Sequence, residues 1–140
     1  MKKNVYRRWQ PLQGIPDHFY LKYLHYNYEG LKIILDCFDD GSKIVEIFFE
    51  DYLSYRSIDE GDLFVLDKED LMVENIQNRE KLPEVGGLRI VDFSSYVEWF
   101  YFVNQGIREK KEDIIHYGIY TWDDCIDILS AVPPIVKWLE

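Results

Sequence analysis

LKIILDCFDDGSKIVEIFFE, residues 31–50, decides the fold because it contains two apolar runs on either side of an Asp-Asp-Gly turn. Each run has one wholly apolar parity and one mixed parity, which is the pattern of a β-strand with one buried face. A two-residue loop would set the apolar face of one strand against the mixed face of the other. A three-residue loop over 39–41, with its glycine left-handed, matches the two apolar faces instead. The predicted register is defined by two apolar pairs, Leu35 with Val45 and Ile33 with Ile47.

Further strands are expected on both sides of this hairpin. Residues 18–28 carry aromatic and apolar side chains on both parities, which suits a strand that forms a three-stranded meander with the hairpin. The other segments with strand composition are 52–58, 88–93, 114–120 and an edge tail at 135–139. Together they predict a single α+β domain over 1–140, with one largely antiparallel sheet of six or seven strands.

One helix is well marked, over about 95–105. Ser95 and Glu98 have the spacing of a capping box, apolar residues follow at helical intervals, and Gly106 can end the helix. Because so many of its residues are aromatic, we expect this helix to pack on the sheet.

Two other segments are ambiguous. Residues 121–130 fit either a helix or a strand, and we favour a strand that enters from a turn at 122–124. Residues 67–87 have weak helical spacing and end in proline and glycine, so we expect a loop with one short helix.

Charge is concentrated in one part of the chain. The protein has 140 residues and a formal net charge of −10. Residues 36–74 hold 13 acidic and 3 basic side chains, so their net charge equals that of the whole chain. A chain this acidic should be repelled by nucleic acid and by anionic lipid, and a basic protein is its natural complement. The basic residues among the first ten are expected to form a solvated terminus.

The composition predicts a cytoplasmic protein. No apolar run approaches the roughly 18 residues of a membrane span, and the basic start leads into proline and glycine instead of an apolar signal core. Cys37 and Cys125 lie inside apolar runs, which favours buried reduced thiols over a disulfide or a reactive thiol. No CxxC motif supports a zinc site, and we predict no metal and no cofactor.

Arg56 is the most interesting single residue, because it is the lone base in residues 44–67, among tyrosines and many acids. An internal ion pair with Asp59 or Glu60 is favoured, and an anchor for a ligand carboxylate or phosphate is the alternative. The acidic turn at 59–62 lacks the spacing of a calcium loop. The candidate binding residues are Arg56, Asp59, Glu60, Asp62 and His116.

No catalytic residue is predicted. None of the three histidines, His18, His25 and His116, belongs to a recognised metal or nucleophile motif. His25 and His116 could bind a metal or act as acid and base if their strands are neighbours, but ordinary half-buried histidines are favoured. There is no GxSxG motif, and Ser94-Ser95 is interpreted as a helix cap. An enzyme is therefore disfavoured without being excluded.

Two stretches, FEDYLSYRSIDEGD at 49–62 and HYGIYTWDDCIDIL at 116–129, resemble small uncharacterised bacterial proteins. The resemblance covers about 31–62 and 114–129. Some of these proteins are similar in size and style to the immunity proteins that neutralise secreted toxins. The resemblance implies a bacterial cytosolic protein of α+β build. It carries no catalytic signature and transfers no functional residue.

The aromatic content supports a binding function. The chain has 11 Tyr, 8 Phe and 4 Trp, and such residues build both protein interfaces and ligand pockets. The leading hypothesis is a non-enzymatic acidic binding protein, of inhibitor or immunity type, whose charges steer a basic protein partner. The alternative is a small-molecule-binding protein or enzyme with an aromatic pocket around Arg56 and His116. A self-associating structural protein is a third hypothesis.

Overall fold

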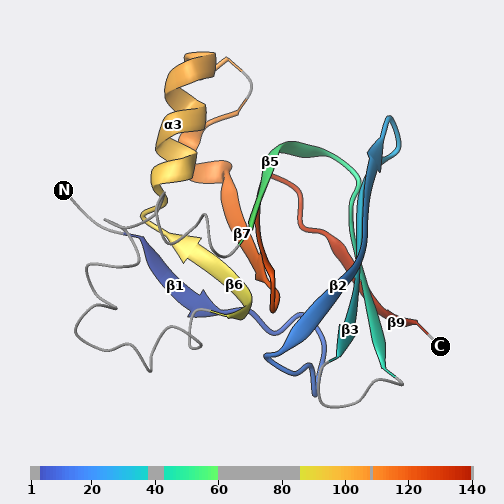
Figure 1. The fold of residues 1–140 in the computed structure, drawn as a ribbon. Helices are drawn as coiled ribbons and strands as arrows, with labels where there is room; N and C mark the ends of the chain where they lie inside the picture. Colours follow the sequence, from blue (N-terminus) through green and yellow to red (C-terminus); the bar gives the residue numbers. More distant parts are fainter. Residues whose placement is uncertain (1–3, 38–42, 60–85, 108, 140) are drawn as a thin grey trace.

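The computed structural model describes residues 4–37, 43–59, 86–107 and 109–139, and it has an α+β fold with two antiparallel sheets (Figure 1). The five-stranded sheet has the order β1 (Val5–Arg8), β6 (Gly87–Asp92), β7 (Ile115–Tyr120), β8 (Asp124–Ser130) and β5 (Tyr52–Asp59). The four-stranded sheet has the order β2 (Phe19–Asn27), β3 (Gly30–Cys37), β4 (Ile44–Phe49) and β9 (Ile135–Leu139). The helix α3 (Ser95–Asn104) and the 3-10 turn η3 (Lys111–Asp113) connect β6 to β7.

The central hairpin has the predicted register. Leu35 lies opposite Val45 and Ile33 lies opposite Ile47. Their side chains are fully buried because the apolar parities of both strands face the same core. The predicted three-residue loop at 39–41 lies outside the described residues.

The prediction of one sheet was wrong, because the chain changes sheet between β4 and β5. Only Glu50 and Asp51 separate these strands, yet β5 pairs with β8 and not with β4. The two sheets share one apolar core, in which Ile33 and Ile47 from one sheet cluster with Ile126 from the other. Alternation in sequence shows which side of a strand is buried, and it does not show which strand lies beside it.

The predicted helix is present, but its cap is Ser94 and not Ser95. The Ser94 side chain accepts a hydrogen bond from the Val97 backbone N–H at 3.0 Å. The helix ends at Asn104, and its C-cap is Gln105 with a positive φ. Gly106 follows, also with a positive φ, and its N–H donates to the Tyr101 carbonyl, so Gly106 takes part in closing the helix as predicted. Its buried side chains are Tyr96, Val97 and Phe100, which pack in a small apolar cluster with Ile114 and Leu129.

The structure also bears on the predictions for the terminal segments, the ambiguous segments and the cysteines. Residues 121–130 enter β8 from a turn, as favoured, and 135–139 form the edge strand β9. The prediction of a solvated N-terminal arm was wrong in part, because β1 pairs with β6 and Arg7 forms an ion pair with Asp92. Both cysteines are buried, and neither forms a disulfide. Most of the loop predicted at 67–87 lies outside the described residues. Among the described helices, none is long and apolar enough to cross a membrane.

Candidate functional site

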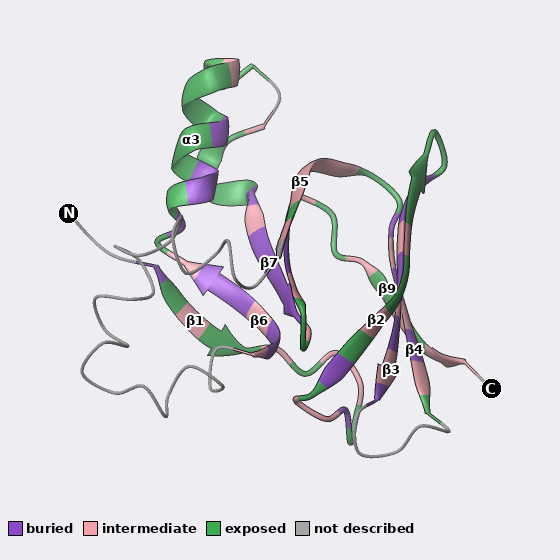
Figure 2. Cartoon of the chain, in the orientation of Figure 1, coloured by how far each residue is buried: buried purple, intermediate pink, exposed green. Residues whose placement is uncertain are grey.

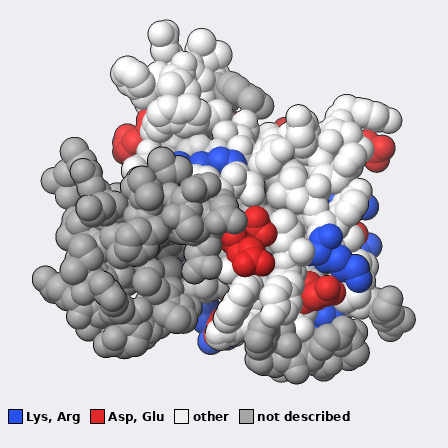
Figure 3. All heavy atoms as spheres, viewed as in Figure 1, with Lys and Arg blue, Asp and Glu red and all other residues white. Residues whose placement is uncertain are grey.

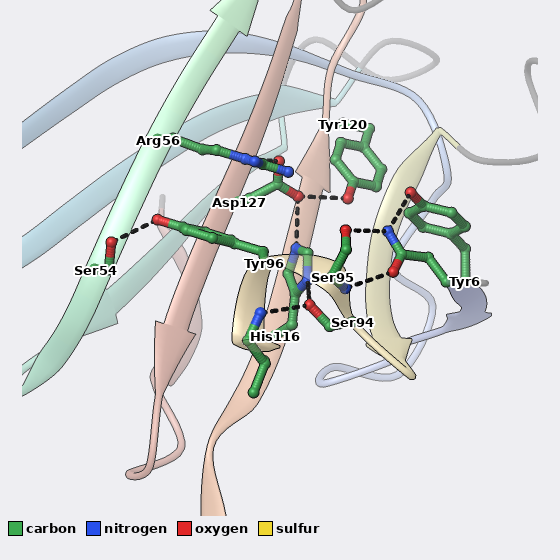
Figure 4. Close-up of polar contacts among 11 residues, drawn as sticks. Tyr6, Ser54, Arg56, Ser94, Ser95, Tyr96, His116, Tyr120 and Asp127 are labelled. Atoms are coloured by element: carbon green, nitrogen blue, oxygen red, sulfur yellow. Dashed lines mark hydrogen bonds and ion pairs between the residues drawn. The ribbon is translucent and has the colours of Figure 1, made fainter. Parts of the chain in front are cut away.

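Two of the predicted site residues, Arg56 and His116, meet on a third residue that the sequence analysis did not select, Asp127 (Figure 4). Their strands make this meeting possible, because β8 lies between β5 and β7. Arg56 lies opposite Asp127, and Asp127 lies opposite Gly118. Arg56 therefore has an internal ion-pair partner, as favoured, and this partner lies on β8.

Gly118 provides the space in which this cluster forms. His116 and Tyr120 lie two residues on either side of it and so share its sheet face. A Cβ atom on Gly118 would lie 2.5 Å from the Tyr120 ring and hydroxyl. The missing side chain thus lets the Tyr120 ring fold back over the strand, where its hydroxyl donates to Asp127.

Asp127 is the centre of a buried polar network. Its Oδ1 accepts hydrogen bonds from His116 Nε2 at 2.7 Å and from the Tyr120 hydroxyl at 2.6 Å. Its Oδ2 accepts from Arg56 Nε at 3.1 Å. Burial raises the pKa of Asp127, but the hydrogen bond and charge of His116, the charge of Arg56 and the hydrogen bond of Tyr120 outweigh it, so the pKa is lowered. Asp127 is an ionised carboxylate inside the protein, and burial beside that charge raises the pKa of Tyr120.

The same network holds the helix. The Arg56 guanidinium lies over the Tyr96 ring at 4.3 Å from its centroid, and the Tyr96 hydroxyl shares a hydrogen bond of 2.6 Å with Ser54. Burial raises the pKa of Tyr96, which therefore stays neutral near pH 7. A residue of the helix is thus fixed to two residues of β5.

Ser94 extends the network to the first turn of α3. Its Oγ lies 2.6 Å from His116 Nδ1. Because the Asp127 carboxylate can only accept, Nε2 of His116 carries a proton. Nδ1 then accepts from the Ser94 hydroxyl when the ring is neutral and donates to the Ser94 oxygen when the ring is charged. The Ser94 oxygen also accepts from the Val97 backbone N–H, so Ser94, His116 and Asp127 each have hydrogen-bond partners.

Serine, histidine and aspartate in this order are also the groups of nucleophilic hydrolysis. Here the His116 and Asp127 side chains are 1% and 3% exposed, and Ser94 is buried. The serine oxygen is engaged by both the helix cap and the imidazole. Together with Arg56 and Tyr96, the arrangement crosslinks β5, β7, β8 and α3, and Ser94 and His116 also line a hollow beside the helix.

Of the acidic residues predicted for the site, only the backbone of Asp59 lies in the described part of the chain. Asp59 ends β5, where its backbone lies opposite Asp124. Glu60 and Asp62 lie outside the described residues. His25 is exposed on β2, in the other sheet from His116, so the proposed histidine pair does not form. Within the described part of the chain, no group of three His, Cys, Asp or Glu residues could hold a metal ion.

A different kind of surface lies on the outer side of α3. Trp99, Phe102 and Val103 are 54%, 79% and 51% exposed, and Ile107 just after the helix is 81% exposed. Figure 2 shows the helix exposed except for the strip that faces the sheet. In Figure 3 the surface over α3 is almost entirely uncharged. We call these four residues the apolar helix face.

Comparison of the chain with protein-family models, curated proteins and solved structures gave no match.

Proposed function

We propose that this protein is a non-enzymatic, acidic binding protein of inhibitor or immunity type, which binds a basic protein partner through the apolar helix face. The observation that carries the proposal is the exposure of Trp99, Phe102, Val103 and Ile107 on and just after one short helix. The proposal includes a bacterial cytosolic setting, which rests on the resemblance of 31–62 and 114–129 to small bacterial proteins.

The exposed side chains are of the kind that anchors interfaces. Single exposed apolar residues are ordinary, but a group of large ones on one element marks an interaction surface. Aromatic anchors such as Trp99 and Phe102 contribute most to binding when a partner covers them. Covering apolar area stabilises a complex by about 25 cal/mol per Å² before the costs of association are subtracted.

The helix presents these side chains in a fixed orientation. Tyr96 is held by Arg56 and Ser54, and the first turn is capped by Ser94, which is in turn bonded to His116. A surface ordered before binding loses less conformational entropy on association. This supports a function in which the buried network positions the helix and the helix contacts the partner.

Charge supports the choice of a basic partner. The net charge of −10 produces a long-range negative potential, which speeds the approach of a positively charged protein and weakens with added salt. Apolar contacts on α3 would then hold the complex once it has formed. We therefore expect the association rate to depend on salt more strongly than the dissociation rate does.

The second candidate is a hydrolase, and the specific observation in its favour is the hydrogen-bonded chain Ser94–His116–Asp127. It predicts covalent labelling of Ser94 by a fluorophosphonate probe, and loss of labelling in Ser94→Ala but not in Ser95→Ala. An absence of labelling in the folded protein would reject it.

Affinity capture tests the leading proposal. Tagged protein is incubated with cytosol of its native host at low and high salt, and bound proteins are identified by mass spectrometry. We expect one basic protein that is captured by the wild type and by Tyr28→Asp, a control at a 96% exposed aromatic in the β2–β3 turn. Phe102→Asp should lose it. Equal capture by Phe102→Asp and the wild type would overturn the proposal.

A further inference from the structure

A hollow of about 650 Å³ lies beside the first half of α3. Ile90, Val97 and Ile114 give it an apolar lining, and all three side chains are buried. Phe93 also lines it, is 54% exposed, and takes a left-handed φ of 54° in the turn between β6 and α3.

Of the carboxylates that line the hollow, one has no ion-pair partner among the described residues. Arg7 pairs with Asp92 at 2.7 Å, and Lys111 pairs with Glu98. Glu112 also lines the hollow, is exposed, and has no ion-pair or hydrogen-bond partner among the described residues. The hollow therefore combines an apolar lining with one unpaired negative charge.

We propose that this hollow receives an arginine side chain of the protein partner. The inference rests on the proposed function, and it names the residue type by which the partner is anchored. The methylene stem of an arginine can lie on Val97 and Ile114 while its charged end stays near solvent. The guanidinium can then bind the Glu112 carboxylate with two parallel hydrogen bonds.

Arginine fits this site better than lysine does. A guanidinium is planar and more weakly hydrated than an ammonium, so it stacks on an aromatic ring while it binds a carboxylate. Phe93 supplies such a ring at the hollow. A lysine could satisfy Glu112 as a point charge, but it has no planar group with which to stack on an aromatic ring.

Three capped tripeptides test the proposal: Gly-Arg-Gly, Gly-Lys-Gly and Gly-citrulline-Gly. Citrulline keeps the shape of arginine without its charge. Each is titrated into the full chain, and the methyl NMR signals of Val97 and Ile114 report binding. We expect saturable shifts with the arginine peptide, and affinity lower by about fivefold or more for the other two and for Glu112→Gln. Glu109→Gln, an acid of the same segment that does not line the hollow, should bind like the wild type.

Three results would overturn the inference: equal affinity for the citrulline or lysine peptide, unchanged affinity in Glu112→Gln, or no shift at Val97 and Ile114. Its failure can be distinguished from failure of the proposed function. Phe102→Asp should lose the captured partner while it still binds the arginine peptide. If only the peptide result fails, the helix proposal stands and the arginine anchor is wrong.

Discussion

The Asp127 network and the apolar helix face both depart from the usual distribution of residues in proteins, in opposite directions. Asp127 is a charge inside the protein, and Phe102 is a large apolar side chain outside it. The charge is bonded to His116, Tyr120 and Arg56, whereas Phe102 is 79% exposed to solvent. A satisfied buried group stabilises the fold, and an exposed apolar group is available to another molecule. We therefore expect the network to stabilise the fold, and we propose that the helix contacts a partner.

Replacing Asp127 should have the largest effect on stability. Asp127→Asn removes the buried ion pair with Arg56 and changes the hydrogen bonds to His116 and Tyr120. We expect a loss of about 3 kcal/mol, at the lower end for a broken buried pair because Arg56 is 35% exposed and can turn toward water. Urea unfolding measures it, with the exposed Asp123→Asn as control. A loss equal to the control would mean that the network does not stabilise the fold.

Acid should remove part of the same stabilisation. The folded-state pKa of Asp127 is lowered, so its contribution is complete above the unfolded value of about 3.9 and is lost as the pH falls through the folded value. The unfolding free energy should therefore decline more steeply below about pH 4 in the wild type than in Asp127→Asn. Parallel curves would show that this carboxylate has the same pKa folded and unfolded.

Gly118→Ala tests the space on which the network depends. The new Cβ would displace the Tyr120 ring and weaken its hydrogen bond to Asp127. We expect a loss of about 2 kcal/mol, as for overpacking in a filled interior. Gly118→Ala in a Tyr120→Phe background, which keeps the ring, should cost nearly as much. A much smaller cost there would mean that the hydroxyl, not the ring, sets the constraint.

Ser94→Ala removes the helix cap and the hydrogen bond to His116. We expect a loss of about 1 to 2 kcal/mol, and less than half of that for Ser95→Ala. Amide hydrogen exchange of Val97 should quicken in the first variant only, because the Ser94 oxygen is its acceptor. If Ser95→Ala had the larger effect, the capping assignment would be wrong.

The helix face should show the smallest effect on stability. Phe102→Asp removes an exposed side chain, so we expect the unfolding free energy to change by less than about 0.5 kcal/mol. Thermal unfolding of the isolated protein checks this. A large destabilisation would show that Phe102 is packed in solution, and the contrast with Asp127 would disappear.

The sequence contained enough information for the local elements. The register of the central hairpin followed from two alternating runs, and α3 followed from its capping and closing residues. β1 was missed because the sequence VYRR has no clear alternation and carries two charges. The division into two sheets was missed because strand neighbours are set by long-range pairing.

The site was less accessible to sequence reasoning. Arg56 and His116 were selected from their local surroundings, but their common partner lies 71 positions from one and 11 from the other. Asp127 did carry one signal, since it is the single charge within the apolar run CIDIL. The exposure of Phe102 carried none, because an apolar residue in a helix is expected to be buried until the packing is known.

Site-specific photocrosslinking tests the central claim most directly. A benzophenone amino acid is placed at position 102 in the apolar helix face, or at position 28 in the β2–β3 turn, and each protein is irradiated in cytosol of its native host. We expect one basic protein to be crosslinked from position 102 and not from position 28. Crosslinking from position 28 alone, or from neither position, would contradict the claim that this protein binds its partner through α3.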